Sequence, residues 1–351
     1  MSAVAAAASR LAAFDFDLPP ELIAQTPAAR RDGARLLVLG RGVNPVRHAA
    51  VVDLPGLLRG GDLLVFNDVR VRPARLHGRL ASGGAVELLL VRELADGTWE
   101  CLGKPGKRLR PDTVVRLPDG STARVVAPVP GGRYAIDFGA GRSVEALLAE
   151  HGEVPLPPYI ARPDGPLAAD RDRYQTVFAR RAAAIAAPTA GLHFTEALLA
   201  QLGAAGVPCA WVTLEVGPAT FLPLRDDDVE GHALEGEWAE IPAATVDAIA
   251  AARAAGGRVI AVGTTTTRAL ESAARRPGGL AAGRRLAEAF IRPGFEFRVL
   301  DGMLTNFHLP RSTLLMLVSA FAGRERVLEA YAEAVRARYR FYSYGDAMLI
   351  L

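Results

Sequence analysis

Hydrophobic and polar positions follow two different patterns along the 351-residue chain. The first occupies both ends of the sequence, where runs of consecutive apolar residues alternate with amphipathic stretches. The runs predict strands at 35–39, 62–66, 210–215, 238–241 and 258–262, and the stretches predict helices at 195–205, 244–255, 265–274 and 326–339. Strands that alternate with helices predict an α/β fold, with a mostly parallel sheet flanked by helices.

The second pattern occupies the segment from 75 to 138, where short stretches of β character are separated by turn-forming clusters such as SGG, PDG and PGG. The predicted strands are 75–80, 85–94, 98–102, 113–117, 122–129 and 133–138. Short strands at this spacing predict a small antiparallel β-barrel. A helical stretch at 143–152 follows. We therefore predict an inserted barrel domain, residues 73–153, within a discontinuous α/β domain of residues 1–72 and 154–351.

The most unusual stretch runs from 298 to 323. Residues 301–309 have the composition of a polar loop, and from Arg311 onward an almost wholly apolar run predicts a buried helix. Ser312 or Thr313 is the expected N-cap and Gly323 the expected stop. A polar loop that leads into a helix start brings together backbone N–H donors, a hydroxyl and a guanidinium. This arrangement suits an anionic or oxygen-rich ligand, although a capped core helix without a ligand would have the same spacing.

Other motifs are weaker on their own. GTTTTR (263–268) follows a predicted strand, so its threonines are either a ligand loop or a plain helix cap. We expect this loop and the loop at 216–220 at the carboxyl edge of the sheet, where ligands of α/β proteins bind. His193 lies between apolar neighbours, as a core histidine does. The segment 136–141 matches an Asp-x-Gly-x-Gly turn of methyltransferases, but it follows a barrel strand, and we interpret it as a hairpin end.

Charge is distributed unevenly. The net charge is +3, yet residues 70–142 hold 13 Lys or Arg against 7 Asp or Glu, which is +6 and leaves −3 for the rest. This asymmetry predicts a basic face on the barrel that suits a phosphate backbone. The two cysteines are far apart, as expected in a reducing cytoplasm. No group of residues has metal-ligand spacing, so we expect no metal. The apolar start at 1–9 is too short for a signal peptide, so we expect no membrane association.

Seven segments occur in the order found in one known family. They are LVFNDVRVRPARL (64–76), PLPPYI (155–160), DRYQTVFA (172–179), AAPTAGLHFT (186–195), RVIAVGTTTTRALES (258–272), TNFHLPRSTLLMLVSAFAG (305–323) and RYRFYSYGDAMLI (338–350). Together they resemble the S-adenosylmethionine:tRNA ribosyltransferase-isomerase family of queuosine biosynthesis. The resemblance covers nearly the whole chain.

The resemblance implies a reaction. The ribosyl group of S-adenosylmethionine would be transferred and isomerised onto 7-aminomethyl-7-deazaguanine at the wobble position of a tRNA with a GUN-type anticodon, giving epoxyqueuosine-tRNA, adenine and methionine. S-adenosylmethionine would be a co-substrate, with no prosthetic group, and the enzyme would be a cytoplasmic monomer. A flipped-out base is commonly held by stacking on aromatic side chains, here Phe307, Tyr342 or Tyr344.

Residue type and motif membership assign the expected roles. The catalytic candidates are His193, Glu215, His308 and Asp346. The candidates for substrate binding are Asn67, Arg70, Thr189, Thr264, Thr265, Thr266, Asn306, Arg311, Ser312 and Tyr344. The candidates for tRNA binding are Arg72, Arg75, Lys107, Arg108 and Arg110.

The chain departs from the family pattern at Glu153, Glu215 and Glu235, where the family usually has histidine. Glu215 ends a predicted strand, so we predict that it serves as a base or as the partner of the sulfonium. Two alternatives stay open. One is an S-adenosylmethionine-dependent RNA methyltransferase, and the other is a divergent family member with lost or changed activity that only binds RNA.

Overall fold

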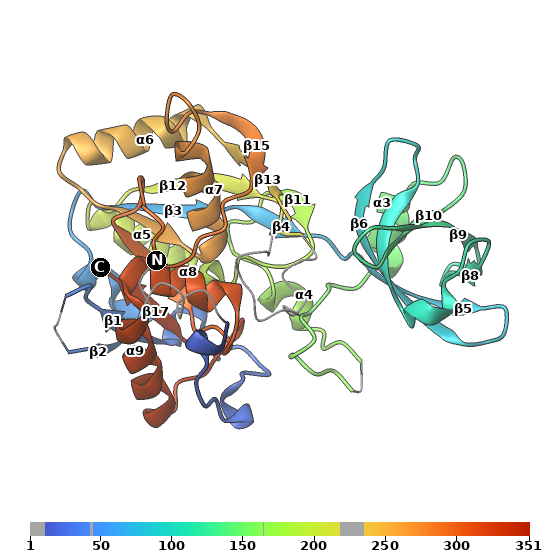
Figure 1. The fold of residues 1–351 in the computed structure, drawn as a ribbon, viewed down its shortest axis with the longest axis horizontal. Helices are drawn as coiled ribbons and strands as arrows, with labels where there is room; N and C mark the ends of the chain where they lie inside the picture. The colour runs from blue at the N-terminus through green and yellow to red at the C-terminus, as the bar shows by residue number, and fades with distance from the viewer. Residues whose placement is uncertain (1–10, 43–44, 164, 218–234) are drawn as a thin grey trace.

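The computed structural model describes residues 11–42, 45–163, 165–217 and 235–351. The apolar start of the chain and residues 218–220 of the predicted loop lie outside this part. The described residues form a large sheet covered by helices and a barrel that lies beside it (Figure 1).

Nine described strands form the large sheet, in the order β15-β13-β12-β3-β14-β16-β17-β1-β2. Their bounds are β1 Arg35–Leu39, β2 Arg47–Ala50, β3 Leu63–Asn67, β12 Cys209–Leu214, β13 Glu237–Ile241, β14 Val259–Val262, β15 Gly283–Ala287, β16 Gly302–Asn306 and β17 Ala347–Ile350. Four neighbouring pairs are parallel, β12–β3, β3–β14, β14–β16 and β1–β17, and the other four are antiparallel. The α/β prediction is confirmed, but the sheet is mixed and not mostly parallel.

Residues 301–309, predicted as a polar loop, contain the central strand β16. Every residue of β16 is buried, as is every residue of its antiparallel neighbour β17. A strand buried on both faces shows no alternation of apolar and polar residues. Thr305 and Asn306 therefore look like loop residues in the sequence, although their backbone pairs with Met348 and Ala347.

Two hydrophobic cores lie against the two faces of the sheet. In β3, Leu63 and Val65 belong to one core, and Leu64 and Phe66 to the other, because successive side chains of a strand point to opposite faces. The first core includes α6 (Ala243–Ala254), α7 (Thr264–Ala274), α8 (Thr313–Ala322) and α9 (Arg324–Arg336), and the second includes α5 (Glu196–Ala204) and the short α2 (Leu54–Leu57). Helices on both faces agree with the sequence pattern.

The predicted cap of α8 is confirmed. Ser312 accepts a hydrogen bond from the Leu315 N–H at 3.2 Å, and Gly323 ends the helix with φ 87°. Only glycine adopts that backbone angle without strain. Ser312 is thus occupied as a helix cap.

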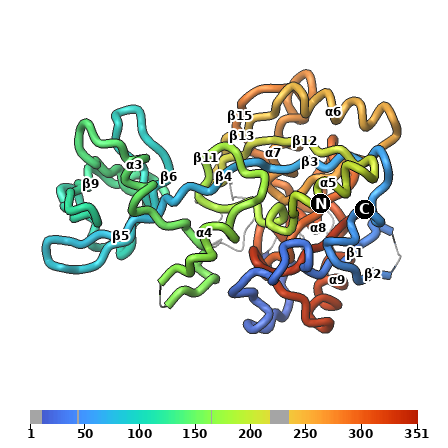
Figure 2. Tube along the Cα trace, turned by 180° about the vertical axis from the view of Figure 1, so that it is seen from behind, coloured from blue at the N-terminus to red at the C-terminus, as the bar shows by residue number. Residues whose placement is uncertain are grey.

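All six predicted barrel strands are present and close into a barrel in the order β10-β7-β6-β5-β8-β9. Their bounds are β5 Arg75–Leu80, β6 Ala85–Glu93, β7 Trp99–Lys104, β8 Val114–Arg116, β9 Thr122–Val129 and β10 Arg133–Asp137, and the helix α3 (Val144–His151) follows. The barrel has its own hydrophobic core, which includes Leu76, Leu88 and Val125. Seen from behind in Figure 2, it again stands apart from the large sheet.

The barrel connects to the sheet through a few short segments. Two short strands, β4 (Val69–Val71) and β11 (Arg181–Ala184), pair in parallel beside it, and the short helix α4 (Asp170–Arg173) lies between them in sequence. Backbone hydrogen bonds in both directions between Arg75 and Glu153 bring the entry and the exit of the barrel together. We propose on this basis that the domain boundaries lie at 72–73 and 153–154.

Candidate active site

A cavity opens where β12, β14 and β16 end. β12 and β14 each pair in parallel with β3, and β16 pairs in parallel with β14, so the three strands run in the same direction. Their carboxyl ends therefore lie at one edge of the sheet. The cavity with its mouth encloses about 830 Å³, within the range typical of small-molecule sites. We call it the edge cavity. Val216, the loop 263–265 and residues 305–308 contribute to its wall, so the two motif loops lie where the sequence places them.

The start of α7 forms one wall. Gly263 precedes the helix with φ 94°, and no side chain caps the helix start. Thr264 and Thr265 line the edge cavity, whereas Thr266 is fully buried and donates its hydroxyl hydrogen to the Val262 carbonyl at 2.9 Å. Two of the three predicted threonines are therefore available to a ligand, beside the positive end of the helix dipole.

Asn306 is the central polar group of the cavity. Its side chain is 2% exposed, and Nδ2 donates to the Tyr342 carbonyl at 3.1 Å and to His193 Nε2 at 3.2 Å. Oδ1 has no hydrogen-bond partner among the described residues. A buried amide oxygen without a partner is costly, so this oxygen marks the place where a ligand would donate a hydrogen bond.

The two buried histidines are uncharged at neutral pH. Burial lowers the pKa of His193 to about 4 and the pKa of His308 to about 3. His193 lies behind Asn306 and holds its amide. His308 itself lines the edge cavity, with Nε2 2.9 Å from the Thr305 hydroxyl and its backbone N–H donating to the Tyr331 hydroxyl at 3.0 Å.

The cavity wall contains an ion pair that is not predicted from the sequence. Glu237 at the start of β13 pairs with Arg268 of α7, and its Oε1 accepts the Gly217 N–H at 2.9 Å. Burial raises the pKa of Glu237, and the positive charge of Arg268 acts against that rise. Arg268 is the last residue of the GTTTTR motif and follows Thr264 by one helical turn, so the sequence does indicate that it lies near the threonines. Glu237 gives no comparable signal in the sequence.

The aromatic candidates separate into wall and core. The ring of Phe307 packs against Tyr331, Tyr339 and Phe341 in the core, and Tyr344 is 3% exposed. Tyr342 lines the edge cavity with Tyr159, and their ring centroids are 3.9 Å apart. Of the three predicted aromatics, Phe307 and Tyr342 contribute to the wall of this cavity, and Tyr344 does not.

Comparison with known proteins shows the family of the chain. The family model described as queuosine biosynthesis protein matches residues 11–350. The chain belongs to the queuosine biosynthesis family of transferase-isomerase enzymes. It is 54% identical to the S-adenosylmethionine:tRNA ribosyltransferase-isomerase of Anaeromyxobacter sp. (strain Fw109-5), over 97% of this chain and 99% of that one. It is 52% identical to the protein of the same name from Geobacter sulfurreducens, over 96% and 98%.

A solved structure supports the same family. The crystal structure of S-adenosylmethionine tRNA ribosyltransferase from Thermotoga maritima is 37% identical in sequence and has a TM-score of 0.55, and the match covers 97% of this chain and 100% of that chain. The methyltransferase interpretation has no support in these comparisons. The Asp137 turn that suggested it lies at the exit of the last barrel strand, where Asp137 accepts the Gly139 N–H at 2.8 Å.

Several predicted site residues of this queuosine family enzyme lie behind the edge cavity. Asn67 bridges β3 to Leu214 and approaches the Thr265 hydroxyl at 3.4 Å. Asp346 accepts the backbone N–H groups of Arg35 and Arg340, and the Tyr344 hydroxyl donates to Asp170. These contacts give the three residues structural positions. Their functional roles stay predictions.

The remaining predicted ligand residues lie in two places. Thr189 lines the edge cavity. Arg311 precedes α8, is exposed, and adopts φ 55° while its N–H donates to the Phe14 carbonyl. It does not line the edge cavity, so an anchoring role there would require a ligand that extends beyond it.

Glu215 lies outside the edge cavity. It lines a second cavity of about 570 Å³ between the barrel and β13, together with Glu235 and Arg133, which we call the junction cavity. Glu215 pairs with Arg284 at 2.9 Å, and Glu235 pairs with Arg133 at 2.9 Å. Glu153, the third glutamate in question, contacts His77 at the entry to the barrel.

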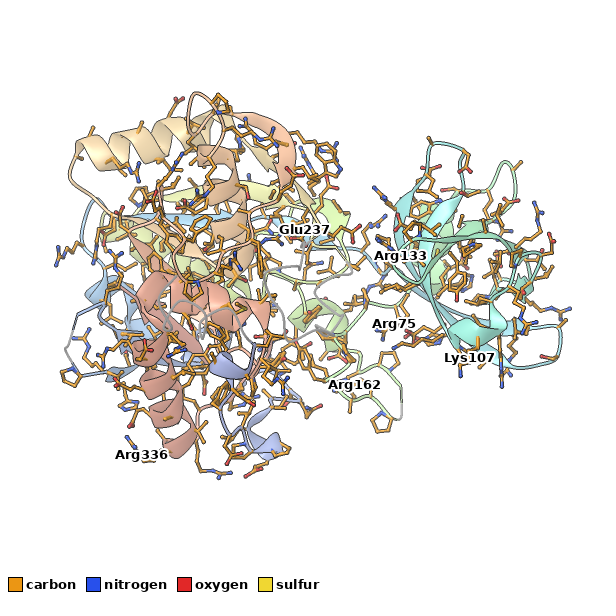
Figure 3. The ribbon with its side chains drawn as sticks, viewed as in Figure 1. Arg75, Lys107, Arg133, Arg162, Glu237 and Arg336 are labelled. Atoms are coloured by element: carbon orange, nitrogen blue, oxygen red, sulfur yellow. The ribbon has the colours of Figure 1, made fainter. Side chains whose placement is uncertain are left out.

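The predicted tRNA-binding residues separate into an exposed group and a packed group. Lys107, Arg108 and Arg110 are exposed next to the short turn η5 (Gly106–Arg108), and Figure 3 shows Lys107 on the outside of the barrel. Arg72 donates to the Val91 carbonyl and Arg75 to the Leu156 carbonyl, so both fix the barrel connections. Arg70 is exposed on β4.

The described residues contain no group of three or more His, Cys, Asp or Glu placed to hold a metal ion. None of the helices in the described part of the chain is long and apolar enough to cross a membrane.

Proposed function

We propose that the enzyme transfers and isomerises the ribosyl group of S-adenosylmethionine onto the aminomethyl group of 7-aminomethyl-7-deazaguanine in tRNA, giving epoxyqueuosine-tRNA, adenine and methionine. The observation that carries the proposal is the edge cavity, whose wall contains a buried amide oxygen without a partner. Relatives that are more than half identical over nearly their whole length carry names that specify S-adenosylmethionine and tRNA.

The groups of the edge cavity fit S-adenosylmethionine. The Asn306 oxygen can accept from a ribose hydroxyl or the methionine ammonium. Thr264, Thr265 and the uncapped start of α7 suit a carboxylate or hydroxyl oxygens. The carboxylate of Glu237 lies in the same wall, where its charge is paired with that of Arg268. The largely apolar remainder of the wall excludes water, which would otherwise trap an opened sugar.

His308 is our proposed proton-transfer group. The reaction needs a base near the C5′ hydrogens, which the sulfonium acidifies, and a hydrogen-bond donor near the departing adenine. Among His193, Glu215, His308 and Asp346, His308 is the one that lines the edge cavity. Because its pKa lies far below neutrality, the ring is uncharged at neutral pH and is a weak base. Its proposed part is therefore to donate a ring N–H hydrogen bond to the departing adenine. His193 acts through Asn306 in this proposal, as a positioning residue.

The RNA partner meets the enzyme on the barrel side. We propose that a tRNA with a GUN-type anticodon contacts Lys107, Arg108 and Arg110 through its phosphates, since exposed basic residues next to one turn suit a backbone. The same positive surface without the edge cavity would describe a protein that only binds RNA.

Product analysis with two labels tests the proposal. The purified protein is incubated with tRNA that carries the aminomethyl base and with S-adenosylmethionine labelled either in the ribose or in the methyl group. We expect ribose label on the tRNA and one adenine released per label. Methyl label on the tRNA would identify a methyltransferase. Binding of the tRNA with neither label transferred to it would identify an RNA-binding protein that has lost the activity.

A further inference from the structure

The junction cavity is formed by both parts of the molecule. Val91, Arg92 and Arg133 come from barrel strands β6 and β10, and Glu215, Glu235 and Trp238 come from the segments around β12 and β13. In Figure 3, Arg133 lies on the side of the barrel that faces Glu237. The cavity is therefore open to a molecule that contacts barrel and sheet together.

The two cavities share part of their walls. Val216 and Glu237 line both. A transfer reaction between a small molecule and a nucleotide of a large RNA needs two adjoining sites, one enclosed and one reachable from the surface. The shared wall makes the edge cavity and the junction cavity such a pair.

Carboxylates and arginines alternate around the junction cavity. Arg133 pairs with Glu235 across the gap and also reaches Glu100 at 2.6 Å, which Arg92 contacts from its other side at 2.6 Å. Glu215 pairs with Arg284 at 2.9 Å. The side chain of Glu235 is 47% exposed, so its carboxylate can exchange Arg133 for a ligand without a large desolvation cost.

An aromatic ring completes the cavity. Trp238 is 40% exposed, which is unusual for so large an apolar side chain, and the Arg284 guanidinium lies over its ring at 4.5 Å. Exposed indole rings next to guanidinium groups are stacking platforms for nucleic-acid bases. Trp238 is better placed for this task than Phe307 or Tyr344, whose rings are buried in the core.

We propose that the junction cavity is the subsite for the acceptor base: a base turned out of an RNA loop stacks on Trp238, and the carboxylates of Glu215 and Glu235 bind its cationic aminomethyl group and its N–H donors. The inference rests on the proposed function, which supplies an acceptor with a primary amine. A guanine-like edge presents adjacent N–H donors that a carboxylate accepts in pairs. A phosphate would meet the same carboxylates with repulsion, so the RNA backbone lies elsewhere, on the basic surface of the barrel.

Binding of two RNA hairpins tests the subsite. Both have the sequence of the anticodon stem-loop; one carries the aminomethyl deazaguanine and the other an ordinary guanine. Affinities are measured for the parent, Glu235→Gln, Trp238→Phe and Trp238→Ala. Glu329→Gln on α9 is the matched control, because it removes an exposed carboxylate from a distant helix. Calorimetry with S-adenosylmethionine alone reports on the edge cavity.

We expect the parent to prefer the modified hairpin. Glu235→Gln should reduce that preference by about tenfold, the effect of losing one charge-assisted hydrogen bond. Trp238→Ala should weaken the binding of both hairpins. Trp238→Phe should keep most of the parent's affinity, and it should abolish the quenching of tryptophan fluorescence that stacking of the base causes in the parent. Affinity for S-adenosylmethionine should stay within about twofold. Glu329→Gln should behave as the parent does.

The two proposals fail in different ways. If the parent forms no ribosylated RNA but still prefers the modified hairpin through Glu235, the proposed function is wrong and the subsite stands. If the parent is active and Glu235→Gln and Trp238→Ala bind both hairpins with the parent's preference and affinity, the subsite is wrong. A parent that does not distinguish the two hairpins would also overturn it.

Discussion

The edge cavity and the junction cavity share a wall, yet they are built from opposite materials. The edge cavity is lined by buried groups that stay uncharged, His308 and Asn306, with His193 behind Asn306, and by the ion pair of Glu237 and Arg268. The junction cavity is surrounded by ion pairs with partly exposed members. Placement relative to solvent, more than residue type, therefore decides what a polar group contributes.

The contrast also separates two tasks. Buried neutral groups in a low-dielectric wall hold a small molecule in one geometry and keep water away from a reactive intermediate. Exposed ion pairs can be exchanged for those of an incoming partner at low cost. We therefore expect mutations in the edge cavity to have large effects and mutations at the junction to have modest effects.

The largest effect on stability should appear when the same substitution, glutamate to glutamine, is made at Glu237 and compared with Glu235. Glu237→Gln leaves Arg268 buried beside a neutral amide and should lower the free energy of unfolding by about 3–5 kcal/mol. Glu235→Gln removes a half-exposed partner and should cost less than about 1 kcal/mol. Urea denaturation measures both. A double variant, Glu237→Gln with Arg268→Met, should recover most of the loss, and equal costs at 235 and 237 would contradict the contrast.

Acid should destabilise the protein through the buried histidines. Because the pKa of folded His193 is lowered to about 4, the unfolded chain binds the proton first as the pH falls. The stabilisation is complete above about pH 6.5 and decreases towards pH 4, by about 3 kcal/mol at about 1.4 kcal/mol per pKa unit. His193→Gln should make the loss of stability between pH 6.5 and pH 4 shallower by this amount. An unchanged slope would show that folding does not lower the pKa of His193.

Asn306→Leu should remove the ligand contact of the edge cavity while it keeps a branched side chain at this position. We expect kcat/KM for S-adenosylmethionine to fall about a hundredfold, because the ligand loses one buried hydrogen bond and the orientation that this bond gives it. Gln201→Leu, an exposed amide on α5, is the control and should have no effect. Activity close to that of the parent in Asn306→Leu would remove Asn306 from the substrate contact.

The smallest effect should be that of the barrel surface. Replacing Lys107, Arg108 and Arg110 with alanine should weaken tRNA binding about tenfold. It should also reduce the slope of log affinity against log salt by about two to three, because binding with fewer phosphate contacts releases fewer counterions. Arg276, Arg336 and Arg338, replaced together, are the control, since they are exposed on other elements. An unaltered salt slope in the barrel variant would exclude it from the tRNA contact surface.

The sequence predicts the barrel more completely than the sheet, for a physical reason. Barrel strands are separated by glycine-rich turns, and in β9 the first five residues alternate between exposed and buried. The neighbouring strands β16 and β17 are buried throughout, and the residues that end β16, Thr305 and Asn306, line the edge cavity. Sequence periodicity fails where function and burial on both faces coincide.

The same reason separates the site residues that the sequence identifies from those that it misses. Thr264 and Thr265 follow the predicted strand at 258–262, so their position at the carboxyl edge is visible in the sequence. Asn306 and His308 are visible as polar residues of a predicted loop, although Asn306 ends the strand β16. Glu237 reaches the cavity from β13, which pairs antiparallel with β12, so chain order does not connect it to the other groups. Trp238 follows it by one residue and faces the other side of the strand.

A crystal structure with S-adenosylmethionine bound, in the absence of RNA, would show which cavity holds the small molecule. We expect density for the ligand in the edge cavity, with one of its N–H or O–H groups within hydrogen-bond distance of Asn306 Oδ1 and the sulfonium on the side of Glu237, while the junction cavity holds only solvent. Ligand density in the junction cavity, or an edge cavity in which Asn306 Oδ1 contacts no ligand atom, would contradict it.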